Sequence, residues 1–220
     1  MLRLFLKYRE ALFDGALTTL ELAVIVWVVG LSVGTFLGIW RASSRSGVTQ
    51  RVGAVAGLAF SSVPILVYLL WAYYPLQSEL GVTVSPFITA VVVLSLYNAL
   101  VVSELVRAGI ADFPPALRLA AAVTGVPSGR FHREVVLPIV LRSALPACLA
   151  TQVNALHLTL FASLISLDEL FRTAQRINAV EYKAVDVFSL ITVFYFLMSF
   201  PLLLLARYLQ RRLFLPGMDR

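Results

Sequence analysis

Long apolar runs fill most of this chain, and they constrain its fold more than any other feature. Val82–Ser103 holds 22 residues, and Ser143–Leu167 holds 25, without one Asp, Glu, Lys or Arg. Apolar stretches of about 18 or more residues are long enough to cross a bilayer as helices. Hydrophobic residues make up 60% of the 220 and charged residues only 14%, so a water-soluble chain could not cover this surface. Lipid must therefore be part of its solvent.

Five such runs predict an all-α membrane protein with five transmembrane helices. Some runs contain Gly or Pro, which a helix bundle tolerates because neighbouring helices satisfy the freed backbone groups. We find no linker or repeat that would divide the chain, so residues 1–220 are expected to form a single domain. The spans are placed at about residues 17–40, 52–74, 84–107, 138–165 and 187–209.

The uneven distribution of Lys and Arg predicts the orientation in the membrane. Five spans put the termini on opposite sides, and 12 of the 18 basic residues then share the side of the C-terminus and of the loop at 112–130. Loops rich in Lys and Arg stay in the cytoplasm. We therefore expect the N-terminus outside and the C-terminus in the cytoplasm. Nucleic acid is a poor candidate partner, because the basic residues are scattered over loop ends.

The sequence carries no pattern for catalysis or metal binding. It has no phosphate-binding G-x-x-x-x-G-K-[ST] loop and no H-E-x-x-H motif, and His132 and His157 are too far apart to suggest a metal site. We predict no catalytic residue, no metal and no cofactor on this chain. If the protein moves a solute uphill, the energy must come from another subunit.

A polar, arginine-bearing segment, Leu117–Pro138, interrupts the apolar runs. Within it, Ala120-Ala121, Gly125 and Val135-x-Leu137-Pro138 stand at the spacing Ala-Ala, three residues, Gly, nine residues, aliphatic, one residue, Leu-Pro. This spacing resembles the loop motif of ABC-importer permeases, which forms a coupling helix seated in a groove of the ATPase. The alternative is an ordinary amphipathic loop helix. The resemblance implies that the ATPase-docking residues are Leu119, Ala120, Ala121, Gly125, Val126 and Pro127.

The motif departs from the family at one position. Leu119 stands where the family usually has Glu, which pairs with a basic group on the ATPase. We expect a second permease subunit of different sequence to retain that Glu. A dimer of identical subunits is the alternative.

Other segments resemble the polar amino-acid importers within the same family. They are Gly15–Leu20, Ala99–Gly109 and Ser163–Leu170. The resemblance implies a type I importer permease in the bacterial inner membrane. It further implies two ATPase subunits that carry ATP and Mg²⁺, and an extracytoplasmic binding protein that delivers a small polar solute, most simply an amino acid. A solute of another class and a non-transporting scaffold or assembly subunit are the alternatives.

Two charged groups of residues are candidate sites. Glu104 and Arg107 share one helix face and could form a gate or intramembrane pair, or each could reach the headgroups separately. The loop Leu167–Asp186 has apolar residues at helical spacing, which predicts an amphipathic helix along the membrane surface. By resemblance, its residues Asp168, Glu169 and Arg172 contact the binding protein, whereas a bare interfacial anchor is the alternative.

Overall fold

The computed structural model describes residues 1–44 and 47–213, and these residues form helices and no strand. Arg45 and Arg220, two of the charges counted for the orientation, lie outside the described residues. The all-α prediction is confirmed. The elements are α1 (Leu2–Ser43), α2 (Gly47–Ser61), α3 (Ile65–Tyr73), α4 (Pro75–Leu80), α5 (Pro86–Ala111), α6 (Pro115–Val123), α7 (Ser128–Phe131), the π-helix η1 (His132–Val136), α8 (Leu137–Leu158), the 3₁₀-helix η2 (Thr159–Ile165), α9 (Leu170–Glu181) and α10 (Ala184–Arg212).

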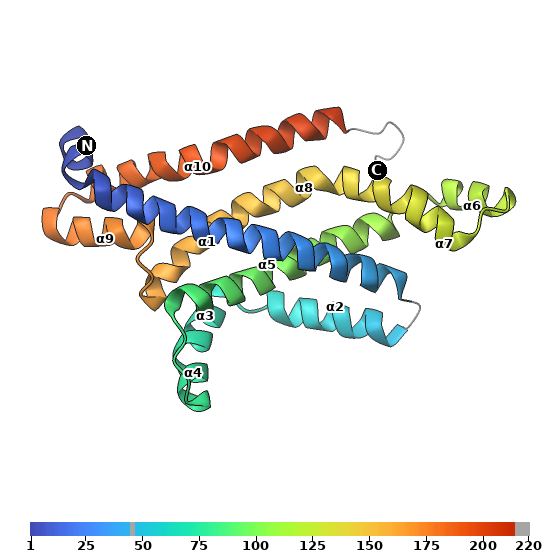
Figure 1. The fold of residues 1–220 in the computed structure, drawn as a ribbon, viewed down its shortest axis with the longest axis horizontal. Coiled ribbons are helices and arrows are strands. Elements are labelled where there is room, and N and C mark those ends of the chain that lie inside the picture. The colour runs from blue at the N-terminus through green and yellow to red at the C-terminus, as the bar shows by residue number, and fades with distance from the viewer. Residues whose placement is uncertain (45–46, 214–220) are drawn as a thin grey trace.

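Four helical segments among the described residues are long and apolar enough to cross a membrane. They run along the long axis of the molecule, with α9 near one end and α6 at the other (Figure 1). We call these the α9 end and the α6 end. The segments are Leu2–Ser43, Pro86–Ala111, Ser128–Ile165 and Ala184–Arg212.

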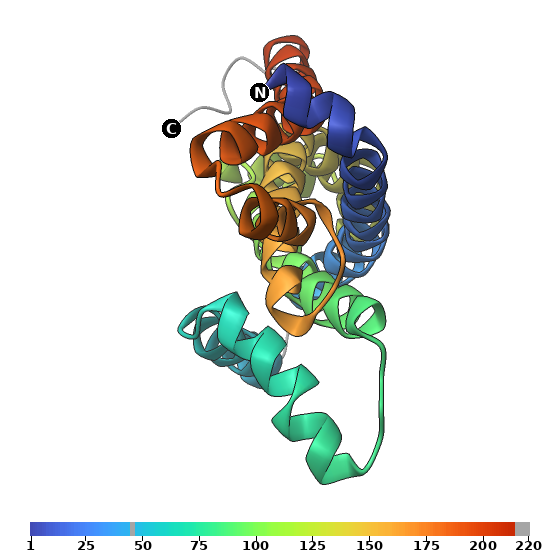
Figure 2. The ribbon, with the colours of Figure 1, turned by 90° about the vertical axis from the view of Figure 1, so that its left-hand side faces the viewer.

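The segment predicted as the second span, 52–74, is not one continuous helix. It consists of α2, with 15 residues, and α3, with 9 residues, separated at Ser62-Val63-Pro64. Pro64 has no backbone N–H and disfavours helical geometry at the residue before it, which explains the break. Figure 2 shows this cyan and teal part of the chain beside the main bundle. The described residues thus contain four long helices and one broken one, where five continuous spans were predicted.

Three glycines on one face of α1 bring α1 into close contact with α5. A Cβ atom added at Gly30 would lie 2.3 Å from Asn98 Nδ2, one at Gly34 would lie 2.6 Å from Ala99 O, and one at Gly38 would lie 2.7 Å from Ser103 O. Distances below 3.0 Å are not tolerated by real Cβ atoms. Small residues spaced by four let membrane helices pack closely, where lipid offers no hydrophobic drive to associate. We call these three residues the glycine seam.

A buried amide pair ties α8 to the same two helices. Asn98 Nδ2 on α5 donates to Gln152 Oε1 on α8 at 2.7 Å and to the backbone oxygen of Val26 on α1 at 3.2 Å. Trp27 Nε1 donates to the backbone oxygen of Gln152 at 2.8 Å. Asn98 is 1% exposed and Gln152 is 2% exposed. Away from water, these hydrogen bonds hold α1, α5 and α8 in one register.

The glycine seam yields a prediction for stability. Gly34→Ala should lower the free energy of unfolding by about 1–3 kcal/mol, because the new methyl group overlaps the α5 backbone. The control is Gly57→Ala on α2, where an added Cβ meets nothing within 4 Å and the helix should gain about 0.5–1 kcal/mol. Unfolding of the two purified variants in detergent measures both. Equal stability of the variants would show that the α1–α5 contact is looser than described.

Candidate functional site

Helix α6 is an exposed, partly apolar helix at one tip of the molecule (Figure 1). Pro115 at its first position suits a helix start, since the missing N–H has no partner there in any case. The helix has no buried residue, and Leu119 and Val123 are 67% and 80% exposed. Apolar side chains gathered on an exposed helix mark an interaction surface.

A glycine turn ends α6. Gly125 adopts φ 76°, in the left-handed region that glycine enters without strain. Its N–H donates to Ala122 O at 3.2 Å, and the N–H of Val126 donates to Ala121 O at 3.0 Å. These two bonds form a Schellman motif, which satisfies the last carbonyls of the helix. Leu119, Ala120, Gly125, Val126 and Pro127 are exposed and Ala121 is half-buried, so the predicted docking residues lie together at the tip of the molecule.

The other end of the loop is a widened turn. After α7 the chain passes through the π-helix η1, in which the Leu137 N–H donates to His132 O, five residues back. Pro138 follows and has no N–H to donate to the carbonyl of Glu134, so an ordinary α-helix cannot continue through this point. The Leu-Pro pair of the loop motif therefore marks the point where the loop becomes α8.

The α6 loop is anchored to α5. Arg118 Nη2 donates to the backbone oxygen of Ile110 at the end of α5, and its guanidinium lies 5.9 Å from the centre of the Phe113 ring. Phe113 is 2% exposed and packs edge to face on Phe131. Arg118 thus connects α6 to α5, and Phe113 connects the same region to α7.

Glu104 and Arg107 on α5 form an ion pair. Arg107 Nε lies 3.1 Å from each carboxylate oxygen of Glu104. The Glu104 side chain is 52% exposed, so in this chain the pair is not fully buried. Glu104 has a second partner, because Arg41 Nη2 lies 3.4 Å from its Oε2.

Arg41 was not among the residues predicted to form a site. It lies in the last turn of α1, is 8% exposed, and donates from Nη1 to Ser103 Oγ at 3.3 Å. Its partners stand about sixty positions away in sequence, and no local pattern connects them. Only its burial and its contacts set Arg41 apart from the other arginines that were counted for orientation.

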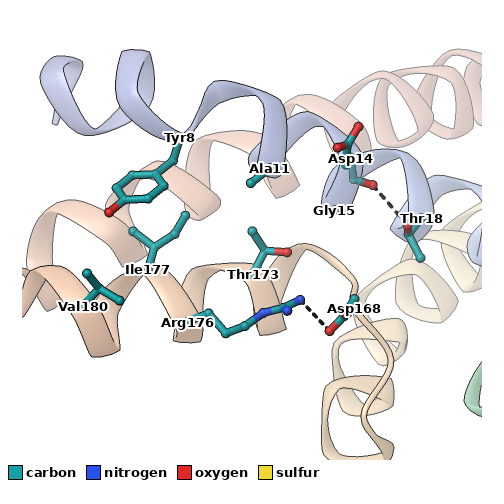
Figure 3. Close-up of a pocket in the computed structure, with 10 residues that line it drawn as sticks. All are labelled: Tyr8, Ala11, Asp14, Gly15, Thr18, Asp168, Thr173, Arg176, Ile177 and Val180. Carbon is teal, nitrogen blue, oxygen red and sulfur yellow. Dashed lines mark hydrogen bonds and ion pairs between the residues drawn. The ribbon is translucent and has the colours of Figure 1, made fainter.

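At the α9 end, Asp168 is exposed and accepts from two arginines. Its Oδ1 lies 3.1 Å from Arg172 Nε and 2.5 Å from Arg176 Nη2. A cavity of about 560 Å³ opens beside it between α1 and α9 (Figure 3), and Asp14 and Thr173 help to line this cavity. Asp168 is exposed at this end, as is Arg176, which the sequence pattern did not single out, whereas Arg172 is half-buried and donates from Nη1 to Ser163 O at 2.7 Å.

Glu169, which the sequence analysis grouped with Asp168 and Arg172, is fully buried in this structure and offers no exposed atom for the predicted contact with the binding protein. Its side chain is 0% exposed and caps the N-terminus of α9, where it accepts from the N–H of Arg172 at 2.7 Å and of Phe171 at 2.8 Å. Tyr195 on α10 donates to its Oε2 at 3.3 Å, and Thr19 Oγ1 on α1 lies 3.4 Å from the same atom. Glu169 thus joins α1, α9 and α10. An acidic residue directly before a helical pattern is the signal of a cap.

Helix α9 uses its apolar face for packing inside the chain. Leu170, Ala174 and Ile177 are buried in one cluster with residues of α1 and α10, such as Leu12 and Leu190. Gly15 permits the close approach, since a Cβ there would lie 3.0 Å from Leu170 Cα. The predicted helix is present, and its apolar spacing is explained by this internal contact.

Burial also affects the titration of Glu169, which lies between the long segments Ser128–Ile165 and Ala184–Arg212. Loss of water raises the pKa of this carboxyl from 4.5 to about 7, although its hydrogen bonds act in the opposite direction. The charged form is therefore the costly one in the folded state. No cation is paired with Glu169 among the described residues.

The comparisons with known proteins agree with the loop motif. Residues 34–215 match the family model described as the binding-protein-dependent transport system inner membrane component. The chain is 31% identical over 208 residues to the glutamate/aspartate import permease protein GltK of Escherichia coli O6:H1, covering 91% of this chain and 92% of that protein. It is 25% identical over 202 residues to the arginine transport system permease protein ArtQ of Bacillus subtilis strain 168, covering 92% of each.

Solved structures show the same fold. A crystal structure of an amino acid ABC transporter with histidines superposes with a TM-score of 0.87 at 25% identity, covering 94% of this chain and 96% of that chain. An inward-facing MetNI methionine ABC transporter superposes with a TM-score of 0.78 at 18% identity, covering 95% and 99%. The second likeness, at lower identity, concerns the fold alone.

The buried carboxyl predicts a pH dependence of stability. The pKa of Glu169 is higher in the folded state than the ordinary 4.5, so its favourable contribution is fully present below pH 4.5 and is lost as the pH rises through about 7. A shift of this size corresponds to about 3 kcal/mol. Glu169→Gln keeps an acceptor for the cap and removes the charge. We expect the unfolding temperature of the wild type to fall relative to that of this variant between pH 5 and pH 8. Parallel pH profiles would contradict the described burial.

Proposed function

Because the chain belongs to the family of binding-protein-dependent transport system inner membrane components, we propose that it forms the membrane pathway of an ATP-driven importer of amino acids. It is a permease subunit and not an enzyme. Support for amino acids comes from relatives named for glutamate/aspartate and arginine, which align over 91% and 92% of this chain. The observation that carries the proposal is the exposed α6 tip, which has the motif spacing of a coupling helix.

We assign the α6 tip to the ATPase. The Ala side chains at 120 and 121 leave room for close packing, while Leu119 offers an apolar contact where the family usually has a carboxylate. ATP and Mg²⁺ belong to the partner ATPases, of which two are expected for two permease subunits. When the ATPases close on ATP, they would move α6, and the anchor between Arg118 and α5 would pass this motion to the spans.

The same assignment sets the orientation. An ATPase is soluble and cytoplasmic, so the α6 end faces the cytoplasm and the α9 end faces the outside of the inner membrane. The amino group of Met1 lies 3.2 Å from Asp186 Oδ1 at the start of α10, which puts the N-terminus at the α9 end. The C-terminus of α10 then lies in the cytoplasm, in line with the distribution of Lys and Arg.

We further propose that the charges at the α9 end, exposed Asp168 and Arg176 with half-buried Arg172, contact the solute-binding protein. Charged rims of this kind guide association more than they add affinity. Glu169 is not part of this surface, because its side chain is buried. Glu104 and Arg107 would lie near the cytoplasmic mouth of the pathway.

The second permease subunit is proposed to have a different sequence. This chain lacks the usual carboxylate at Leu119. In Escherichia coli, two proteins named as glutamate/aspartate import permeases, GltK and GltJ, both resemble this chain, at 31% and 25% identity. Two distinct permeases are thus named for one kind of import among the relatives.

Ala121→Arg tests the docking assignment. A long charged side chain at a close contact should remove most ATP-driven uptake while the permease still inserts, because an unpaired charge would be buried at the interface. The measurement is uptake by reconstituted complexes. Ala121→Ser, which keeps a small uncharged side chain at the same position, is the matched control and should retain uptake. Normal uptake by an intact Ala121→Arg complex would mean that α6 is not the coupling helix.

Affinity purification tests the composition of the complex. The tagged chain, expressed with the genes around it, should bring down a second permease with Glu at the position of Leu119, which mass spectrometry would identify. A complex with two copies of this chain and no other permease would refute the heterodimer. It would leave the importer assignment unchanged.

A further inference from the structure

Arg41 connects three elements at the α6 end. It comes from α1, and its guanidinium contacts Ser103 and Glu104 on α5. The guanidinium also lies close to α2, since a Cβ added at Gly53 would stand 2.5 Å from Arg41 Nε and 3.0 Å from its Cζ and Nη2. A larger residue at position 53 would displace the guanidinium from this position. Arg41 thus lies between α2 and α5.

Helix α2 is attached to α3 through the break at Ser62-Val63-Pro64. No α-helical ladder continues through Pro64, so α2 can change its direction without unfolding either helix. Helix α3 is fixed by Ile65 and Leu69, which are buried with α1 and α5 in one cluster. The break therefore separates a well-packed half of the second span from a half that lies against Arg41.

The contacts of Arg41 are suited to being made and broken. Its Nε is buried and has no acceptor among the described residues, and its hydrogen bond to Ser103 is a long one. A buried donor without a partner costs free energy. If α2 moved away, water could accept a hydrogen bond from this donor and remove the cost. The ion pairs of Glu104 with Arg41 and Arg107 involve only α1 and α5, so they would persist after such a movement.

We propose that Arg41 is a positioning residue for transport, which holds α2 against α5 in this conformation and releases it in another. The contact between Gly53 and the guanidinium is then a latch at the cytoplasmic mouth of the pathway. This inference rests on the proposed importer function. Arg41 neither docks the ATPase nor contacts the solute in this proposal; it couples the position of α2 to the network of Glu104.

The test measures amino acid imported per ATP hydrolysed in vesicles that contain the full complex and its binding protein. Arg41→Met removes the charge and keeps a side chain of similar length. Gly53→Ala displaces the guanidinium while residue 41 remains arginine. Both variants should lower the amount of amino acid imported per ATP by about fivefold or more, which is the low end of typical coupling factors. ATP hydrolysis should be retained. Arg41→Lys should restore part of the ratio. Gly57→Ala, whose Cβ meets nothing within 4 Å, should stay within about twofold of the wild type.

The outcomes separate the two proposals. Wild-type complex that imports no amino acid at the expense of ATP would refute the proposed function itself. If the wild type imports and both Arg41→Met and Gly53→Ala keep its ratio, the latch is wrong. The latch is also wrong if both variants only reduce the amount of complex, because a purely structural role lowers yield without changing the ratio.

Discussion

Close contact between α1 and α5 is the constraint on which the rest of the structure depends. Lipid tails solvate apolar side chains as well as a protein core does, so spans associate through packing and hydrogen bonds. The glycine seam at Gly30, Gly34 and Gly38 supplies this packing, and each glycine meets an atom of α5 where a Cβ would overlap. Asn98 can reach both Val26 and Gln152 only because Gly30 leaves room for its amide.

The two ends of this pair of helices carry the polar features. At one end, Thr19 of α1 meets Glu169 and Leu170 at the start of α9. At the other, Arg41 of α1 meets Glu104 of α5. Helix α1 contacts residues at both the α9 end and the α6 end. A single long helix of this kind can couple a displacement on one side of a membrane to the other side. In the proposed importer, the binding protein acts at one end and the ATPase at the other.

Much of this architecture could be predicted from the sequence, since the bilayer demands long apolar runs and the chain has them. The α6 tip could be predicted because its spacing is local: Ala121, Gly125 and Pro138 lie within eighteen residues of one another. The role of these residues in docking stays a prediction. The glycine seam was not among the sequence predictions, because the contacts that define it come from α5, far away in the sequence.

Other features depend on partners far apart in sequence, and local patterns could not supply them. Glu169 was read as a surface charge because the burial around it comes from Thr19 and Tyr195, on two other helices. Arg41 was counted as one basic residue among many for the same reason. The break at Pro64 was a local signal, but the length and hydrophobicity of 52–74 outweighed it in the prediction of a continuous span.

The widened turn at η1 has a consequence for the phase of α8. A π-helical turn holds one more residue than an α-helical turn, so every later side chain is rotated by about 100° relative to a continuous α-helix. A helical wheel drawn from α7 through Val136 on the assumption of a continuous α-helix would therefore misplace Gln152 by about 100° around the axis of α8. The buried amide pair with Asn98 lies on the face that α8 presents after this extra residue. The loop that carries the docking motif thus also includes the turn at which the phase of the following span changes.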